Sequence, residues 1–143
     1  MRSENPNKLK HLEFIQLVIT RMNVNSFLIK GWAMTVFAAL YALSAKDSNF
    51  TYILITFITI PIFWSLDGFY LSKENRYRKL YNEVIDKKEE DIDFNLDATK
   101  FKNGKCNWFL CMFTYTLFLF YFMLLLITFL IIKNKDFFST FAK

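Results

Sequence analysis

Glycine, proline and histidine are scarce in this 143-residue sequence, which contains 3 glycines, 2 prolines and 1 histidine. Because turn-forming residues are so few, folds made of many short strands are disfavoured and helices are favoured. The sequence has no Gly-rich phosphate loop and no serine or cysteine nucleophile with a nearby base. The single histidine, His11, is expected to lie on the surface of an amphipathic helix. We therefore predict no enzyme, and no catalytic, cofactor-binding or metal site.

Cysteine is also scarce, since Cys106 and Cys111 are the only two in the sequence. They form no C-x-x-C motif, and their spacing of five residues places them on different faces of a helix. We expect both to be reduced residues that pack against neighbours. Lipidation of Cys106, next to the third apolar run, is the alternative.

Apolar residues are abundant, at 54% of the chain, with 18 phenylalanines. Two apolar runs of roughly 20 residues each, the length that crosses about 30 Å of hydrocarbon, lie within 26–71. The turn that joins them, 46–49, is so short that the two helices must be antiparallel neighbours. The third run, Trp108 to Ile132, is the most apolar. These runs predict an all-α membrane protein with a long transmembrane helical hairpin at 26–71 and a third transmembrane helix at 107–132.

Two amphipathic segments, 1–25 and the first part of 72–106, adjoin the hairpin. Each has an apolar stripe with steps of three and four residues. The stripe residues are Leu12, Ile15, Ile19 and Met22 in the first segment, and Tyr77, Leu80, Tyr81, Val84 and Ile85 in the second. No helix stop follows Leu71, so we expect the second span to continue to about Lys88. The two stripes would then pack together as a cytoplasmic helical extension; the alternative places the first segment on the membrane surface. A charged loop completes 72–106, and 133–143 is a short tail.

Lysine and arginine counts predict the orientation. The segment before the first span holds 5, the hairpin turn 1, the segment between the second and third spans 9, and the tail 3. With three spans, the first and third of these segments lie on one side of the membrane and the turn and tail on the other. The two sides then hold 14 and 4 basic residues, which predicts a cytoplasmic N-terminus and an outer C-terminus. The net charge of +5 thus follows membrane topology, and we expect no direct nucleic-acid partner.

Five residues within the hairpin are candidates for a specific role. Asp67 is the only acidic residue in any span, and Lys30 lies at a similar distance from the turn. The two are therefore expected to pair near the cytoplasmic face, although a polar site that gates a pathway is the alternative. Pro61 lacks an N–H and is expected to kink the second span. Ala38 and Ala42 form a small-x-x-x-small pair that packs either against the second span or against another subunit.

Two further groups are predicted outside the spans. Leu80 and Val84 are expected to contribute to a contact between subunits wherever the N-terminal helix leaves them uncovered. Six basic residues are expected to contact anionic lipid headgroups. They are Arg76, Arg78, Lys79, Lys100, Lys102 and Lys105. The acidic stretch 89–97, with five acids and no base, is expected to be a solvated loop or short helix.

Four segments of the sequence carry a resemblance: KHLEFIQLVITRM, NSFLIKGW, FWSLDGFYL and ENRYRKLY. Together they resemble SLATT-like hairpin proteins, small bacterial membrane proteins found beside antiviral systems, and similar accessory proteins of RADAR and type VI CRISPR loci. The resemblance covers about residues 10–85, and the third span is less typical. It implies a protein of the bacterial inner membrane that forms pores or depolarises the membrane when defence is triggered.

A three-span chain has too few helices to enclose an aqueous path, so a pore requires a homo-oligomer. Its partners would be the lipid bilayer, further copies of the chain and a cytoplasmic defence protein. Two alternatives stay open. One is a membrane anchor or scaffold that recruits a cytoplasmic enzyme without forming a pore, and the other is a small holin-like or transport subunit.

Overall fold

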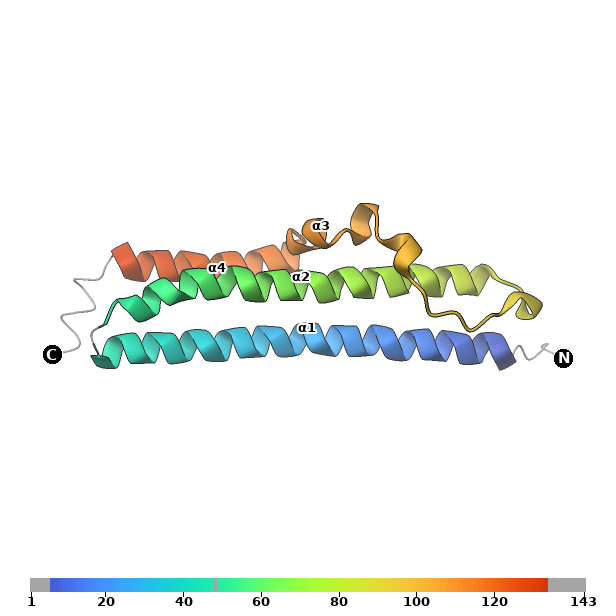
Figure 1. The fold of residues 1–143 in the computed structure, drawn as a ribbon, viewed down its shortest axis with the longest axis horizontal. Helices are drawn as coiled ribbons and strands as arrows, with labels where there is room; N and C mark the ends of the chain where they lie inside the picture. Colours follow the sequence, from blue (N-terminus) through green and yellow to red (C-terminus); the bar gives the residue numbers. More distant parts are fainter. Residues whose placement is uncertain (1–5, 48, 134–143) are drawn as a thin grey trace.

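The computed structural model describes residues 6–47 and 49–133 (Figure 1). Within these residues every regular element is helical, and no strand occurs. Two long helices, α1 (Pro6–Asp47) and α2 (Thr51–Asp86), run antiparallel and pack along their length. A short helix α3 (Trp108–Met112) precedes α4 (Tyr115–Lys133), which lies along the first part of α2. Three of the described helices, α1, α2 and α4, are long and apolar enough to cross a membrane, which confirms the predicted all-α membrane architecture.

The two helices of the hairpin are much longer than a membrane is thick. α1 has 42 residues and α2 has 36. At about 1.5 Å per residue these lengths correspond to about 63 and 54 Å, against about 30 Å of hydrocarbon. The predicted N-terminal segment is therefore no separate helix, since α1 runs from it into the first span without interruption. α2 likewise passes through Pro61 and continues beyond Leu71, as the missing helix stop predicted.

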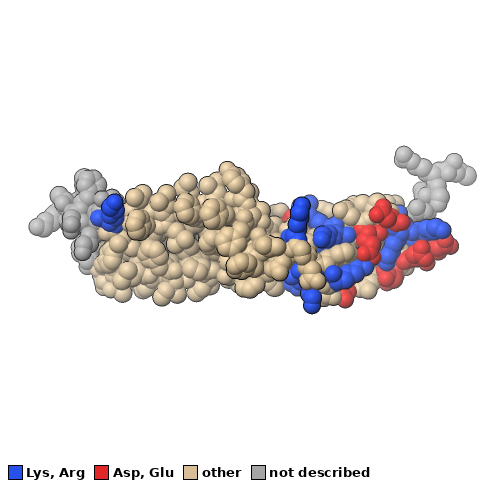
Figure 2. Space-filling view, turned by 90° about the horizontal axis from the view of Figure 1, so that it is seen from above, with Lys and Arg blue, Asp and Glu red and all other residues tan. Residues whose placement is uncertain are grey.

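Charge divides the molecule into two halves (Figure 2). Over 51–72, Asp67 is the only charged residue of α2, and α4 has none before Lys133. From Lys73 to Lys105 charged residues follow in close succession. We call these parts the uncharged half and the charged half. The uncharged part of α2, about 30 Å long, matches the thickness of a hydrocarbon core.

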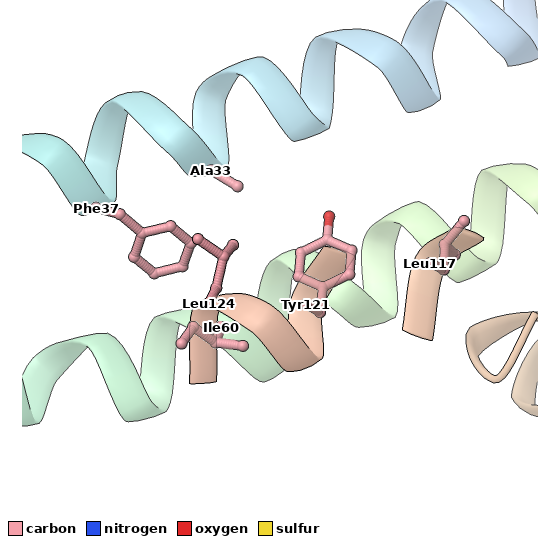
Figure 3. Close-up of a cluster of buried hydrophobic side chains, with 6 residues drawn as sticks. All are labelled: Ala33, Phe37, Ile60, Leu117, Tyr121 and Leu124. Carbon is pink, nitrogen blue, oxygen red and sulfur yellow. The ribbon is translucent and has the colours of Figure 1, made fainter. Parts of the chain in front are cut away.

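The uncharged half has a core to which α1, α2 and α4 all contribute (Figure 3). Its fully or nearly fully buried members are Ala33, Phe37, Ile60, Leu117, Tyr121 and Leu124. In Figure 3 the ring of Phe37 points from α1 toward Ile60 and Leu124. A hydrogen bond of 2.5 Å between the hydroxyls of Tyr41 and Thr128 also joins α1 to α4. Because lipid provides no hydrophobic drive between helices, such close packing and hydrogen bonding must hold the three together.

The charged half has a core of its own, where the two predicted stripes meet. Ile15 and Ile19 of α1 pack with Leu80 and Val84 of α2 and with Ala98 of the following loop. Leu80 is 3% exposed and Val84 is fully buried. α1 and the loop thus cover these two side chains within the chain, so they are not available for the contact between subunits that was expected only where the N-terminal helix leaves them uncovered.

The loop between α2 and α3 follows a path fixed by its own side chains. Three 3₁₀ turns lie in it, η1 (Glu89–Asp91), η2 (Thr99–Phe101) and η3 (Gly104–Cys106). Between the first two, carboxylate or amide oxygens of Asp93, Asn95 and Asp97 each accept a hydrogen bond from the amide two residues ahead. These are successive Asx turns. The amides of Asn95 and Thr99 thereby lower the pKa of Asp93 and of Asp97, respectively, because they stabilise the charged carboxylates.

His11 is fully buried, so its expected place on the surface is wrong. The loop folds back over this part of α1, and the ring of Phe94 lies 5.5 Å from the imidazole, centroid to centroid. Nε2 of His11 lies 3.1 Å from the carbonyl oxygen of Asn95, to which it donates. Nothing in the helical periodicity of α1 indicates this cover, since the loop comes from a segment more than 80 residues away.

The third span is broken, which corrects the prediction of one helix from Trp108 to Ile132. α3 ends at Met112 and α4 begins at Tyr115. The indole N–H of Trp64 donates to the carbonyl oxygen of Met112 at 2.7 Å, and so gives a partner to a carbonyl at the end of α3. Gly68 makes this approach possible, because a Cβ there would lie 2.5 Å from Cγ of Met112. The tail, 133–143, lies outside the described residues except for Lys133.

Candidate functional site: a buried polar cluster between three helices

Four polar side chains meet inside the uncharged half, and we call them the Asp67 cluster. Ser26 and Lys30 come from α1, where a spacing of four residues places them on one face. Asp67 comes from α2 and Tyr121 from α4. Asp67 is completely buried, whereas the side chain of Lys30 is 27% exposed. The cluster therefore has one fully enclosed charge and one that reaches the molecular surface.

Both carboxylate oxygens of Asp67 have partners. Nζ of Lys30 lies 2.6 Å from Oδ2, so the two residues that the sequence analysis paired form an ion pair here. The hydroxyl of Ser26 donates to Oδ1, and Lys30 also donates to this hydroxyl at 2.9 Å. The hydroxyl of Tyr121 donates to Oδ2 at 3.2 Å. This complete set of partners is what a carboxylate needs when water is excluded.

Ser26 and Tyr121 were not identified from the sequence. Ser26 had a usable signal, because it lies one turn from the only lysine within the first span. Tyr121 had no such signal in the sequence, because the break before Tyr115 changes how far along α2 each residue of α4 lies. Its hydroxyl reaches Asp67 because α4 packs against α2 in antiparallel orientation. In Figure 3 it points from α4 toward α1.

The arrangement of the Asp67 cluster pairs and encloses a buried charge. A charged side chain near the centre of a membrane span costs about 2.5–3.5 kcal/mol on insertion scales, and less near the interface. Asp67 lies 16 residues after Thr51, or about 24 Å from the hairpin turn, and hence near the charged half. Among the residues that the structure describes, no group of three His, Cys, Asp or Glu could hold a metal ion.

A line of small residues lies on the outside of α1. Ala38 and Ala42 are both exposed, so their packing against α2, one of the two interpretations, does not occur. The face toward α2 and α4 is instead formed by Ala33 and Phe37. Three further exposed small residues of α1 extend this line, each three or four residues from the next member. The resulting small outer face consists of Gly31, Thr35, Ala38, Ala42 and Ala45.

The six basic residues predicted to contact lipid differ in their surroundings. Arg78 lies 2.7 Å from the buried carboxylate of Glu74, and Lys100 lies 2.6 Å from Glu83. Arg76 donates to the hydroxyl of Ser72. The other three are exposed and make no ion pair within the described ranges; they are Lys79, Lys102 and Lys105.

Both cysteines are buried free thiols, as expected of packing residues. Cys106 is 1% exposed, which leaves its sulfur no access to a lipid-transferring enzyme in this conformation. Comparison with known proteins adds no family: the chain matches no protein-family model, no curated protein and no solved structure. Any function must therefore be argued from the geometry above and from the resemblance of its hairpin.

Proposed function

We propose that this chain is a subunit of a homo-oligomeric, membrane-perturbing or pore-forming protein of the bacterial inner membrane that acts in antiviral defence. The small outer face of α1 is the observation that carries the proposal. Its residues are exposed within the membrane-spanning part, and small side chains allow two helix backbones to approach closely. A contact with a second copy of the chain would use this property.

The Asp67 cluster supports the same proposal. Three helices are too few to enclose an aqueous path through one subunit, so permeation would require a ring of copies. Lys30 is the only charged side chain of α1 between Arg21 and Lys46, and part of it reaches the surface. Lys30 directly precedes Gly31 of the small outer face, so a helix packed there would lie near the level of this cation along α1. The defence role depends on the resemblance to SLATT-like proteins.

Replacing Ala42 by leucine is expected to weaken self-association without unfolding the subunit. The added side chain would project from an exposed position and would hold a neighbouring helix away from α1. We expect the oligomer population in detergent to fall at least about tenfold, the effect of about 1.4 kcal/mol of lost packing. Native mass and single-particle size measure this, together with membrane potential in induced cells.

Thr116→Leu is the matched control, because Thr116 is an exposed small residue on α4 rather than on α1. This variant should keep the wild-type mass and effect on membrane potential. A wild-type protein that stays monomeric and causes no depolarisation on overexpression or phage challenge would contradict the proposal.

A membrane anchor for a cytoplasmic enzyme is the second candidate. The charged half favours it, since that half is a folded helical pair with its own core and a covering loop. Such a surface could bind a cytoplasmic partner while the permeability of the membrane stays unchanged. Depolarisation and self-association would then be absent, while a cytoplasmic protein would copurify with the chain.

Orientation is a separate prediction that both candidates share. The 14 to 4 distribution of basic residues predicts that the charged half lies in the cytoplasm. A reporter active only outside the inner membrane should work when fused after Lys143 and fail when fused at Asn95. The opposite pattern would place the charged half outside and would overturn both candidates.

A further inference from the structure

A small cavity opens where the charged half begins. Its volume is about 60 Å³, several times the roughly 10–15 Å³ that one water requires. Lys73, Arg76 and Tyr77 of α2 form one side, and the loop forms the other with Leu96, Asp97, Ala98 and Thr99. A group of several heavy atoms can therefore enter between α2 and the loop.

The depth of this cavity corresponds to that of lipid headgroups. Leu71 ends the apolar part of α2, and Lys73 is the first cation beyond it. Headgroups add about 5–7.5 Å to each side of the hydrocarbon core, given total and core thicknesses of about 40–45 and 30 Å. Lys73 and Arg76 are separated by about 4.5 Å along the helix axis, so both lie within this layer. Figure 2 shows Lys and Arg side chains gathered at this boundary.

The two cations of the cavity are held in place without a carboxylate partner in the described part of the chain. Nη2 of Arg76 donates to the hydroxyl of Ser72 at 3.1 Å, and Ser72 donates to the carbonyl oxygen of Cys106 at 2.6 Å. Nζ of Lys73 lies 5.4 Å from the centre of the Phe69 ring. By contrast, Arg78 and Lys100 are engaged by carboxylates of the same chain.

We propose that this cavity binds the phosphodiester of an anionic glycerophospholipid. Asp97 also lines the cavity, and its carboxylate accepts a hydrogen bond from the amide of Thr99. One carboxylate against two cations leaves a single net positive charge, which matches a phosphodiester better than a doubly charged phosphomonoester. The exposed Lys102 and Lys105 follow in the same loop and favour a lipid with net negative charge over a zwitterionic one. The proposal requires only that the charged half begins at the headgroups, and does not depend on oligomer or pore formation.

Retention of phosphatidylglycerol by the purified full-length protein tests the site. The protein is taken from mixed bilayers of phosphatidylglycerol and phosphatidylcholine, and bound lipid is counted by native mass spectrometry. Wild type should retain one strongly bound phosphatidylglycerol per chain in preference to phosphatidylcholine. Lys73→Gln should lower that retention about tenfold, because it removes a charge-assisted contact to phosphate. Lys73→Arg should keep it within about twofold, because the cation remains.

Lys79→Gln is the matched control, since Lys79 is an exposed cation of α2 that does not line the cavity. Any headgroup contact of Lys79 belongs to the diffuse attraction of the charged half, so this variant should keep the strongly bound phosphatidylglycerol. Circular dichroism establishes that each variant keeps its helices. An equal loss for Lys73→Gln and Lys79→Gln would show a diffuse electrostatic attraction and overturn the proposal. Equal retention of phosphatidylglycerol and phosphatidylcholine would also overturn it. When phosphatidic acid or millimolar inorganic phosphate is added as a competitor, tighter retention of phosphatidic acid or displacement of the lipid by phosphate would do the same.

Discussion

Replacing Lys30 by methionine is expected to destabilise the protein more than replacing Asp67 by asparagine, although both changes break the same ion pair. Without Lys30, the fully buried carboxylate of Asp67 loses the only cation that pairs with it among the residues 6–47 and 49–133. Removal of one partner of a buried pair typically costs about 3–5 kcal/mol. Asp67→Asn instead leaves a lysine that is 27% exposed and can extend toward the headgroups, and the amide oxygen can still accept from Ser26. We expect about 3 kcal/mol for Lys30→Met and about 1 kcal/mol for Asp67→Asn.

The double variant distinguishes the stability that comes from the ion pair from the stability that each residue contributes alone. If the ion pair stabilises the fold, Lys30→Met/Asp67→Asn should be less destabilised than the sum of the single changes. The free energy of unfolding in detergent measures all three. Lys46→Met is the control, because Lys46 is an exposed lysine at the other end of the span and its loss should change stability by less than about 0.5 kcal/mol. Simple additivity in the double variant would show that the pair contributes nothing.

Gly68→Ala is expected to displace α3 from α2. The added Cβ would lie 2.5 Å from Cγ of Met112 and 3.3 Å from its Cα, so the side chain and then the backbone must move. Overpacking of this kind costs about 1–3 kcal/mol. The hydrogen bond from Trp64 to the carbonyl of Met112 would lengthen as well. Cys111, which is 2% exposed in α3, should then react faster with a thiol reagent.

Two further variants show whether the contact with Met112 causes the faster reaction of Cys111. Met112→Ala in the Gly68→Ala background removes Cγ, and it should restore part of the protection of Cys111. Gly31→Ala makes the same change where no atom lies within 4 Å of the new Cβ. It should leave the reactivity unchanged and stabilise α1 by up to about 1 kcal/mol. Equal reactivity of Cys111 in wild type and Gly68→Ala would contradict the packing described for α3.

The hairpin could be predicted from the sequence because its signals are local. Two apolar runs, a turn too short for anything but antiparallel helices, and two stripes with matching periodicity determine α1 and α2. The pairing of Lys30 with Asp67 follows from the same geometry, since an antiparallel hairpin places residues equally far from its turn side by side.

The remaining features depend on contacts between distant segments, and no local pattern encodes them. His11 has the spacing of an exposed residue, and only the loop around Asn95 covers it. The break after Met112 lies in a continuous apolar run, and the carbonyl at the end of α3 accepts from an indole on α2, far away in the sequence. Tyr121 joins the Asp67 cluster through the packing of α4 against α2. The loop likewise supplies Thr99 to the cavity whose other side is Lys73.

The distribution of the Asp67 cluster over three helices has a consequence for biosynthesis. A ribosome makes α1 first, so Ser26 and Lys30 precede Asp67 by 41 and 37 residues. When the carboxylate of α2 reaches the membrane, its cation is already there, and the cost of inserting a lone charge is reduced. Tyr121 is made 54 residues after Asp67 and can add its hydrogen bond only then. The nascent chain therefore neutralises its buried charge as soon as the hairpin forms, and α4 encloses a pair that already exists.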